Sequence, residues 1–208
     1  MTQELDQKMQ DALESSLAFV KEAAQLKQVL RKTSPIGLER KENSAEHSWH
    51  LAVMAMVLSD HANEDIDLNK VVRMLLVHDL PEVYADDVFI YDRTEEHTVK
   101  EREAAQKLFG LLPDHIAAQF HELWEEFEAG ETAEAKFARA LDRFQPCFCN
   151  YNNGGGTWVE FGISQDAVFE RNAPIEKGST RLWHKIKALV ADATTKGFFP
   201  AKEDVKYG

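Results

Sequence analysis

Residues 71–79 read VVRMLLVHD, an apolar run that ends in the ionisable pair His78-Asp79. Such a run is expected to be buried, and two ionisable side chains at its end are costly to bury unless something satisfies them. A divalent metal ion would do so, because imidazole nitrogens and carboxylate oxygens are both metal ligands. The stretch therefore predicts a buried element that delivers two metal ligands at its end.

Two further residues complete a possible ligand set. His47 has apolar residues four, seven and eleven positions after it, so it lies at the top of the buried stripe of a helix. Asp142 has alanines four and seven positions before it, and such small residues let helices approach closely. Two imidazoles and two carboxylates suit a borderline to hard divalent ion with positions open for water. We therefore predict His47, His78, Asp79 and Asp142 as metal ligands.

Each of these residues also has an ordinary structural interpretation. A histidine on an apolar stripe is more often packed and hydrogen-bonded than bound to a metal. Asp142 could form a salt bridge with Arg139 or Arg143, and His-Asp is a common dipeptide. The ordered set of four is much less expected by chance than any one of its members.

The composition is typical of a soluble globular protein, with 208 residues, 44% of them hydrophobic and 29% charged. The longest unbroken apolar run, residues 51–58, is too short for a bilayer, which takes about 20 residues. The formal net charge is -12 and no strong basic patch is present, so we predict neither a nucleic-acid polymer nor a membrane as partner. An anionic substrate would need local positive charge at its site.

The first residues show no basic segment followed by an apolar one, as a secretory signal would. Cys147 and Cys149 do not form a C-x-x-C pair. We therefore expect a cytoplasmic protein whose two thiols are free.

Apolar residues recur at helical spacing along almost the whole chain, and no segment alternates convincingly as a strand does. We predict an all-α fold, one domain over residues 1–208 with its core at about 20–197. Besides the helices that carry the ligands, the pattern predicts helices at about 4–31, 96–111, 114–129, 164–171 and 180–196, with residues 83–95 irregular.

Local signals place the ends of the helices that carry the ligands. Ser44 is the expected N-cap of a helix to about His61, and Asp67 or Asn69 caps the next one, which ends near residues 80–81. Pro146 follows Asp142 by four positions, so we expect it to kink or end that helix just beyond the metal site.

These segments resemble a known family. Residues 40–49 (RKENSAEHSW) resemble the E-N-x-x-E-H segment of bacterial HD-domain 5′-deoxynucleotidases and related HD-domain hydrolases. Residues 78–82 (HDLPE) resemble their H-D-x-x-E motif, and residues 135–144 resemble the helix of the final ligand. Residues 162–175 also look familial, so the resemblance covers roughly residues 20–197.

The resemblance implies a helical bundle of the HD type and a divalent-metal-dependent phosphomonoesterase acting on nucleoside 5′-monophosphates, deoxyribonucleotides in the better-known members. It implies a bound Mn, Co, Mg, Fe or Zn ion and a homodimer. Glu82 matches the residue assigned to acid–base work on the water nucleophile, and Asp87 matches a residue that contacts the sugar, so both are counted as catalytic. Both could instead belong to a solvated acidic turn.

The chain departs from the family where an arginine, often followed by tryptophan, contacts phosphate and sugar. A gapless match places Lys32-Thr33 there, with Arg31 one residue away. Lysine attracts phosphate as a point charge but lacks the bidentate fork of arginine. Arg31, Lys32 and Asp87 are therefore the candidate substrate-binding residues, and strict specificity for deoxyribose is not expected.

The sequence is also compatible with two other functions. One is hydrolysis of another small phosphate ester or nucleotide by an HD-type enzyme. The other is a helical protein that binds a metal or nucleotide without turnover.

Overall fold

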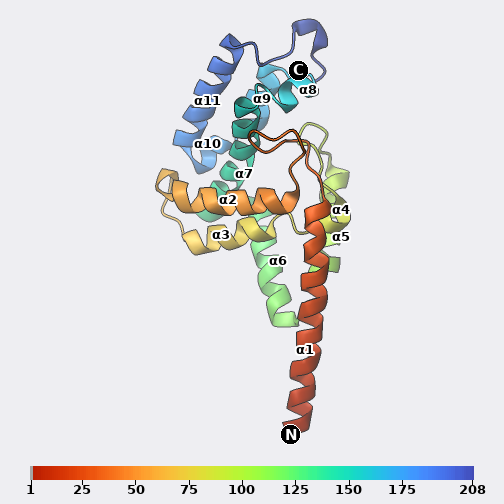
Figure 1. Cartoon of the computed structure of the whole chain (residues 1–208). Coiled ribbons are helices and arrows are strands. Elements are labelled where there is room, and N and C mark those ends of the chain that lie inside the picture. Colours follow the sequence, from red (N-terminus) through yellow and green to blue (C-terminus); the bar gives the residue numbers. More distant parts are fainter. Residues whose placement is uncertain (1) are drawn as a thin grey trace.

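The computed structural model describes residues 2–208, and Figure 1 shows that these residues form helices joined by loops. Within this range the structure has no strand, only isolated bridges between Leu30 and Asn43 and between Ile163 and Tyr207. The predicted all-α fold is confirmed. The α-helices are α1 (Thr2–Ala23), α2 (Ser44–Leu58), α3 (Leu68–Val77), α4 (Glu82–Ala85), α5 (Glu95–Phe109), α6 (Asp114–Ala129), α7 (Ala133–Asn152), α8 (Thr157–Glu160), α9 (Gln165–Asn172), α10 (Ile175–Gly178) and α11 (Thr180–Thr195).

Helix α7 is the centre of the packing. It contacts α2, α3, α6, α10 and α11. Its side chains Phe137 and Leu141 are fully buried, as are Ala135 and Ala138 on the same helix. The two alanines predicted to permit a close helix approach therefore lie in the core. This packing holds Asp142, one residue after Leu141, beside the helices that carry the other predicted ligands.

Helix α1 extends from the rest of the molecule as an arm (Figure 1). Near its C-terminal end, Phe19 packs edge-on against Phe120 of α6, with ring centroids 5.3 Å apart. The predicted helix at 4–31 is too long. The α-helix ends at Ala23, a 3-10 turn covers Ala24–Gln28, and an extended segment then bridges Leu30 to Asn43.

The helix caps explain how the ligand-bearing segments begin. Asn43, not Ser44 as expected, is the N-cap of α2, and it forms a capping box with Glu46. Ser44 is the first residue of the helix and is buried. Of the two caps predicted for α3, Asp67 is the N-cap, and it accepts hydrogen bonds from the backbone N–H groups of Asn69 and Lys70.

The expectation that the helix ends at Pro146 is wrong, because α7 continues through it to Asn152. Proline has no N–H to donate to the carbonyl of Asp142, which costs a helix about 3 kcal/mol. The neighbouring side chains Phe144, Gln145 and Cys147 are buried, so tertiary packing holds the helix on both sides of the proline.

The segment expected to be irregular, residues 83–95, is partly helical. It overlaps the short helix α4, and α5 already begins at Glu95. Asp86, directly after α4, has φ 61°, which lies in the left-handed region that a non-glycine residue seldom adopts. The loop from Asp86 to Thr94 therefore leaves α4 in a sharp turn.

No helix within residues 2–208 combines the length and the apolar character that crossing a membrane requires.

The contact between α10 and α7 yields a first prediction. A Cβ added at Gly178 would lie 2.1 Å from the carbonyl oxygen of Lys136 on α7. Gly178→Ala must therefore push α10 away from the helix that carries Asp142, and such overpacking costs about 1–3 kcal/mol. We expect the free energy of unfolding, measured by urea titration, to fall by that amount.

Lys177→Ala is the matched control for this substitution, since Lys177 is the exposed neighbour on the same short helix. It should leave the stability nearly unchanged. Equal stability of the Gly178→Ala variant and the wild type would contradict the close packing of α10 on α7.

A candidate metal centre and the pocket beside it

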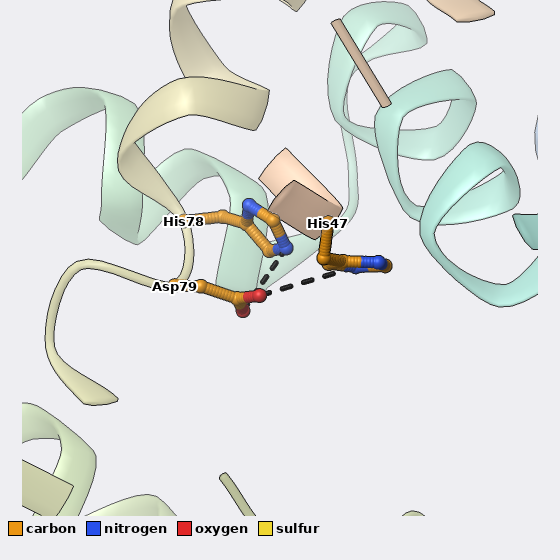
Figure 2. Close-up of side chains that lie close together, drawn as sticks. All are labelled: His47, His78 and Asp79. Carbon is orange, nitrogen blue, oxygen red and sulfur yellow. Dashed lines mark ion pairs between the residues drawn. The ribbon is translucent and has the colours of Figure 1, made fainter. Parts of the chain in front are cut away.

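Three of the predicted ligands converge at the ends of two helices. His47 lies in the first turn of α2, and His78 and Asp79 follow the last turn of α3. One ligand atom from each lies within 4.8 Å of those of the other two. Figure 2 shows the carboxylate of Asp79 facing both imidazoles. The buried run at 71–77 thus ends where its two ionisable residues meet the third.

Asp142 joins this cluster from α7. Its Oδ1 lies 3.0 Å from Nε2 of His47 and 3.8 Å from Nε2 of His78. On the other side, Asp79 Oδ1 lies 3.0 Å from Nε2 of His78, and Asp79 Oδ2 lies 3.9 Å from Nε2 of His47. The structure therefore brings all four predicted ligands together, with each imidazole Nε2 between two carboxylates.

The hydrogen bonds on the far side of the two imidazoles determine which nitrogens face the carboxylates. Nδ1 of His78 lies 2.8 Å from the carbonyl oxygen of Leu75, and Nδ1 of His47 lies 3.1 Å from Oε1 of Gln145. Both neighbours can only accept, so both Nδ1 atoms carry hydrogen. In a neutral imidazole Nε2 then has a lone pair, and in both rings a carboxylate oxygen lies 3.0 Å from this atom.

A lone pair held against a carboxylate oxygen is repulsive unless a proton or a cation lies between them. The pKa values of the two histidines show the effect of these negative carboxylates. Burial lowers the pKa of His47, as does Arg31, but Asp142, Glu42 and Asp79 raise it above its usual value. Burial likewise lowers the pKa of His78, yet the carboxylates of Asp79 and Asp142 raise it well above the usual value.

The donor set therefore fits a divalent metal ion. It consists of two imidazole nitrogens with oriented lone pairs and two carboxylates, a set that suits borderline to hard ions. Nε2 of His78 is buried and makes no hydrogen bond within the part of the chain that the structure describes. A metal would satisfy that atom and remove the repulsion at both imidazoles.

Gln145 and Glu42 lie on the Nδ1 side of the His47 ring, away from the carboxylates of the site. Neither is among the residues predicted from the sequence. The amide nitrogen of Gln145 donates to Oε1 of Glu42 at 2.7 Å, which turns its oxygen toward His47. Such outer partners orient metal-binding histidines. Glu42 lies inside the segment that carries the family resemblance, and Gln145 follows Asp142 by one helical turn, so spacing could have indicated both.

Arg31 reaches the site, whereas Lys32 lies at the rim of the pocket. The Arg31 guanidinium lies 3.1 Å from Asp79, 3.2 Å from Asp87 and 3.6 Å from Glu42, and its side chain is 13% exposed. Lys32 is exposed and lies over the ring of Phe161, with 5.9 Å from Nζ to the centroid. The gapless match that placed Lys32 in the arginine's position is therefore off by one residue in space.

A pocket of about 300 Å³ opens beside the four ligands. Both predicted acidic residues of the loop after His78-Asp79, Glu82 and Asp87, line it. Burial raises the pKa of Glu82 well above its usual value, and the charge of Asp79 adds to this effect. Burial also raises the pKa of Asp87, against the opposing effect of Arg31. The pocket thus holds two carboxyl groups that retain protons to higher pH than usual.

The pocket also contains two arginines that are not among the predicted substrate-binding residues. Arg139 and Arg143, one turn apart on α7, both line it. Across residues 2–208 neither forms an ion pair, so the salt bridge considered for Asp142 with either of them is absent. Arg139 donates to the carbonyls of Phe127 and Glu128, and Arg143 donates to the carbonyl of Arg171.

Four aromatic side chains also line the pocket: Phe89, Tyr91, Phe127 and Trp158. Aromatic faces are suited to stacking on a planar ring. Cys147 also lines the pocket, but burial raises the pKa of its thiol to about 12, so it is no nucleophile at neutral pH. Both cysteines are free, as expected, and both are buried.

Comparison with known proteins identifies the family. The HD domain matches residues 23–183, so the chain belongs to the HD domain family. A crystal structure described as a predicted metal-dependent phosphohydrolase from Magnetospirillum magnetotacticum MS-1 is 44% identical, with a TM-score of 0.87, over 92% of this chain and 97% of that one.

Curated relatives carry a more specific name. The 5′-deoxynucleotidase HDDC2 of Homo sapiens is 37% identical over 133 residues, which are 62% of this chain and 63% of that protein. The protein of the same name from Xenopus laevis is 38% identical over 133 residues, 62% of this chain and 64% of that protein. The chain thus spans a little under two thirds of the length of these relatives.

Graded substitutions test the ligand set. We expect His47→Ala and Asp142→Ala to lose bound metal, because each removes a ligand. Gln145→Ala should keep the ligands but weaken metal affinity by about 10–100-fold, the usual effect of removing an outer partner. Metal content after loading and desalting, measured by mass spectrometry, should be lowest in the two ligand variants and intermediate in Gln145→Ala.

His115→Ala is the matched control for the histidine substitution, because His115 is exposed on α6. Its metal content should equal that of the wild type. Unchanged metal content in both ligand variants would reject the assignment.

Proposed function

We propose that the protein is a divalent-metal-dependent phosphohydrolase that converts nucleoside 5′-monophosphates to nucleoside and phosphate. The observation that carries this proposal is the pair of imidazoles, His47 and His78, whose Nε2 atoms face Asp79 and Asp142 at the mouth of a pocket containing Glu82. The names of the relatives, 5′-deoxynucleotidase and metal-dependent phosphohydrolase, support the same reaction class.

The metal would be held by His47, His78, Asp79 and Asp142. When bound, a divalent ion polarises a phosphoryl oxygen and lowers the pKa of water. Mn, Co, Mg, Fe and Zn are all compatible with nitrogen and oxygen donors, and the resemblance does not choose among them.

Glu82 is suited to handle a proton in this site. Its carboxyl group is buried, and one of its oxygens makes no hydrogen bond within the described residues. Burial and the charge of Asp79 raise its pKa well above the usual value, so it holds a proton more readily than an ordinary carboxyl group does. These properties support a role as the acid–base group for the attacking water.

Arg139 and Arg143 are the best placed groups to attract the phosphate. Arg31 is surrounded by the carboxylates of Glu42, Asp79 and Asp87, so its positive charge is already compensated. The two arginines of α7 line the same pocket and donate only to backbone carbonyls. They supply the local positive charge that an anionic substrate needs in a chain of net charge -12.

The nucleoside would then lie against the aromatic wall. Asp87 is the candidate reader of the sugar hydroxyls, and its contact with Arg31 holds it in place. Thr33 stands where the family often has tryptophan, but Trp158 and the other pocket aromatics provide a stacking surface from elsewhere in the chain.

We further propose that the whole chain forms one HD domain, that it works in the cytoplasm and that it assembles as a homodimer.

Removing the acid–base group tests the mechanism. We expect Glu82→Gln to keep its metal and to lose kcat by about 10²–10⁴, the usual effect of removing a general acid or base. Phosphate release from nucleoside 5′-monophosphates, measured alongside metal content, separates loss of chemistry from loss of metal.

Glu128→Gln serves as the control within the pocket, because Glu128 lines it and faces Arg93 at 3.6 Å. It should retain kcat within a few-fold. A Glu82→Gln enzyme with near-normal kcat would reassign Glu82 to a structural role.

Sugar specificity tests the reading of Asp87. Since this residue is already paired with Arg31, the wrong sugar should cost one hydrogen bond, about 1.5 kcal/mol or roughly tenfold in kcat/KM. We expect discrimination of that size between matched deoxyribo- and ribonucleoside 5′-monophosphates. A preference above about 10³ would show that other pocket groups are left unpaired by the wrong sugar.

A further inference from the structure

Helix α1 carries an exposed apolar stripe. Its five members recur every three or four residues, which places them on one face of the helix. Their exposed fractions lie between 51% and 66%, although all are large apolar side chains: Leu5, Met9, Leu13, Leu17 and Val20. A contiguous apolar face of this kind marks an interaction surface.

Helix α1 makes few contacts with the other helices. Near its C-terminal end Phe19 packs on Phe120, and Glu22 accepts a hydrogen bond from Tyr84 at 3.1 Å. Toward the N-terminus the helix stands clear of the other elements (Figure 1). Isolated helices are marginally stable in water, so an arm of this length gains from a partner that covers its apolar face.

A second unpartnered apolar surface lies on the other side of the molecule. It is a groove of about 500 Å³ between α2 and α11, hereafter the α2–α11 groove. Val57 at this groove is 72% exposed and Val53 is 40% exposed. The apolar residues that line the groove are Val53, Met54, Val57, Leu58, Phe144, Phe148 and Leu182.

The charges of the arm and the groove are complementary. The groove is bordered by Arg181 and Lys185 of α11 and by two histidines, and no acidic side chain lines it. Helix α1 is acidic, with five carboxylates against two lysines: Glu4, Asp6, Asp11, Glu14 and Glu22 against Lys8 and Lys21. A basic border is unusual in a chain of net charge -12, and it suits an acidic helix with an apolar face.

The arm cannot reach its own groove as a continuous helix. Figure 1 shows α1 running away from α2 and α11, with its N-terminus at the opposite end of the molecule from α11. The α1 arm of a second copy meets no such restriction. One chain therefore carries both halves of a helix-in-groove contact, and only another copy can join them.

We propose that α1 of one copy docks, apolar stripe inward, into the α2–α11 groove of a second copy. The two arms are exchanged about a twofold axis, so that each copy both gives and receives a helix and the assembly closes as a dimer. None of the four predicted metal ligands lines the groove. The contact gives an interface to the homodimer proposed above and does not depend on the proposed reaction.

Substitutions on each half of the contact test the proposal. We expect Leu13→Glu on the arm and Val57→Glu in the groove each to raise the dissociation constant of the dimer at least ~10-fold, because each would place a charged carboxylate inside an apolar contact. Sedimentation velocity of the full chain over a range of concentrations measures this. Val99→Glu is the matched control, since Val99 is 56% exposed on α5 and belongs to neither surface.

Reversing the charges of the groove and then of the arm adds a further test, because a misfolded variant would not regain the dimer when the second set of charges is reversed. Arg181→Glu with Lys185→Glu should weaken the dimer, and adding Asp6→Lys with Glu14→Lys to the same chain should restore it. Restoration supports the docking of arm on groove. Weakening without restoration would contradict it.

Cross-linking identifies which surfaces meet. With Leu13→Cys and Val57→Cys in one chain, oxidation should join two copies, while neither single variant should cross-link. A cross-linked Leu13→Cys single variant would show that arms pair with each other and would overturn the proposal. A wild type that stays monomeric, or a dimer indifferent to both glutamate variants, would overturn it as well.

Discussion

The approach of two imidazole Nε2 atoms to the carboxylates of Asp79 and Asp142 is the constraint that the packing of the surrounding helices has to satisfy. It joins the first turn of α2, the end of α3 and the middle of α7, which are far apart in sequence. Four such groups repel one another or demand a proton or cation between them, so the fold has to hold them there by packing. The buried alanines of α7 and the buried run of α3 supply that packing.

Within residues 2–208, two kinds of arginine lie around this centre: one that is paired with carboxylates and two that are not. Arg31 is enclosed by carboxylates and stabilises the acidic cluster, since it contacts Glu42, Asp79 and Asp87. Arg139 and Arg143 line the pocket and form no ion pair within the described residues, so their charge remains available to a ligand. An acidic protein can in this way attract an anion locally, because the first arginine balances the site and the other two face the pocket.

Local signals in the sequence predicted most of the helices well. The all-α class followed from apolar periodicity, and Asp67 was recognised as a cap because its side chain precedes a periodic segment. Pro146 was misjudged, since its local cost is outweighed by the buried side chains on both sides of it. The long helix expected to end at residue 31 stops at Ala23, because the chain is extended where Leu30 bridges to Asn43.

The sequence by itself determined the fold class and the four residues that meet at the candidate metal centre, because residue type, order and helical spacing are local properties. The tertiary structure decided what spacing cannot express. It selected Arg31 rather than Lys32 for the site, turned Gln145 toward His47 and placed Arg139 and Arg143 in the pocket. Those outcomes depend on the angles at which distant helices pack, and a contact between residues about a hundred positions apart leaves no periodic trace in the chain.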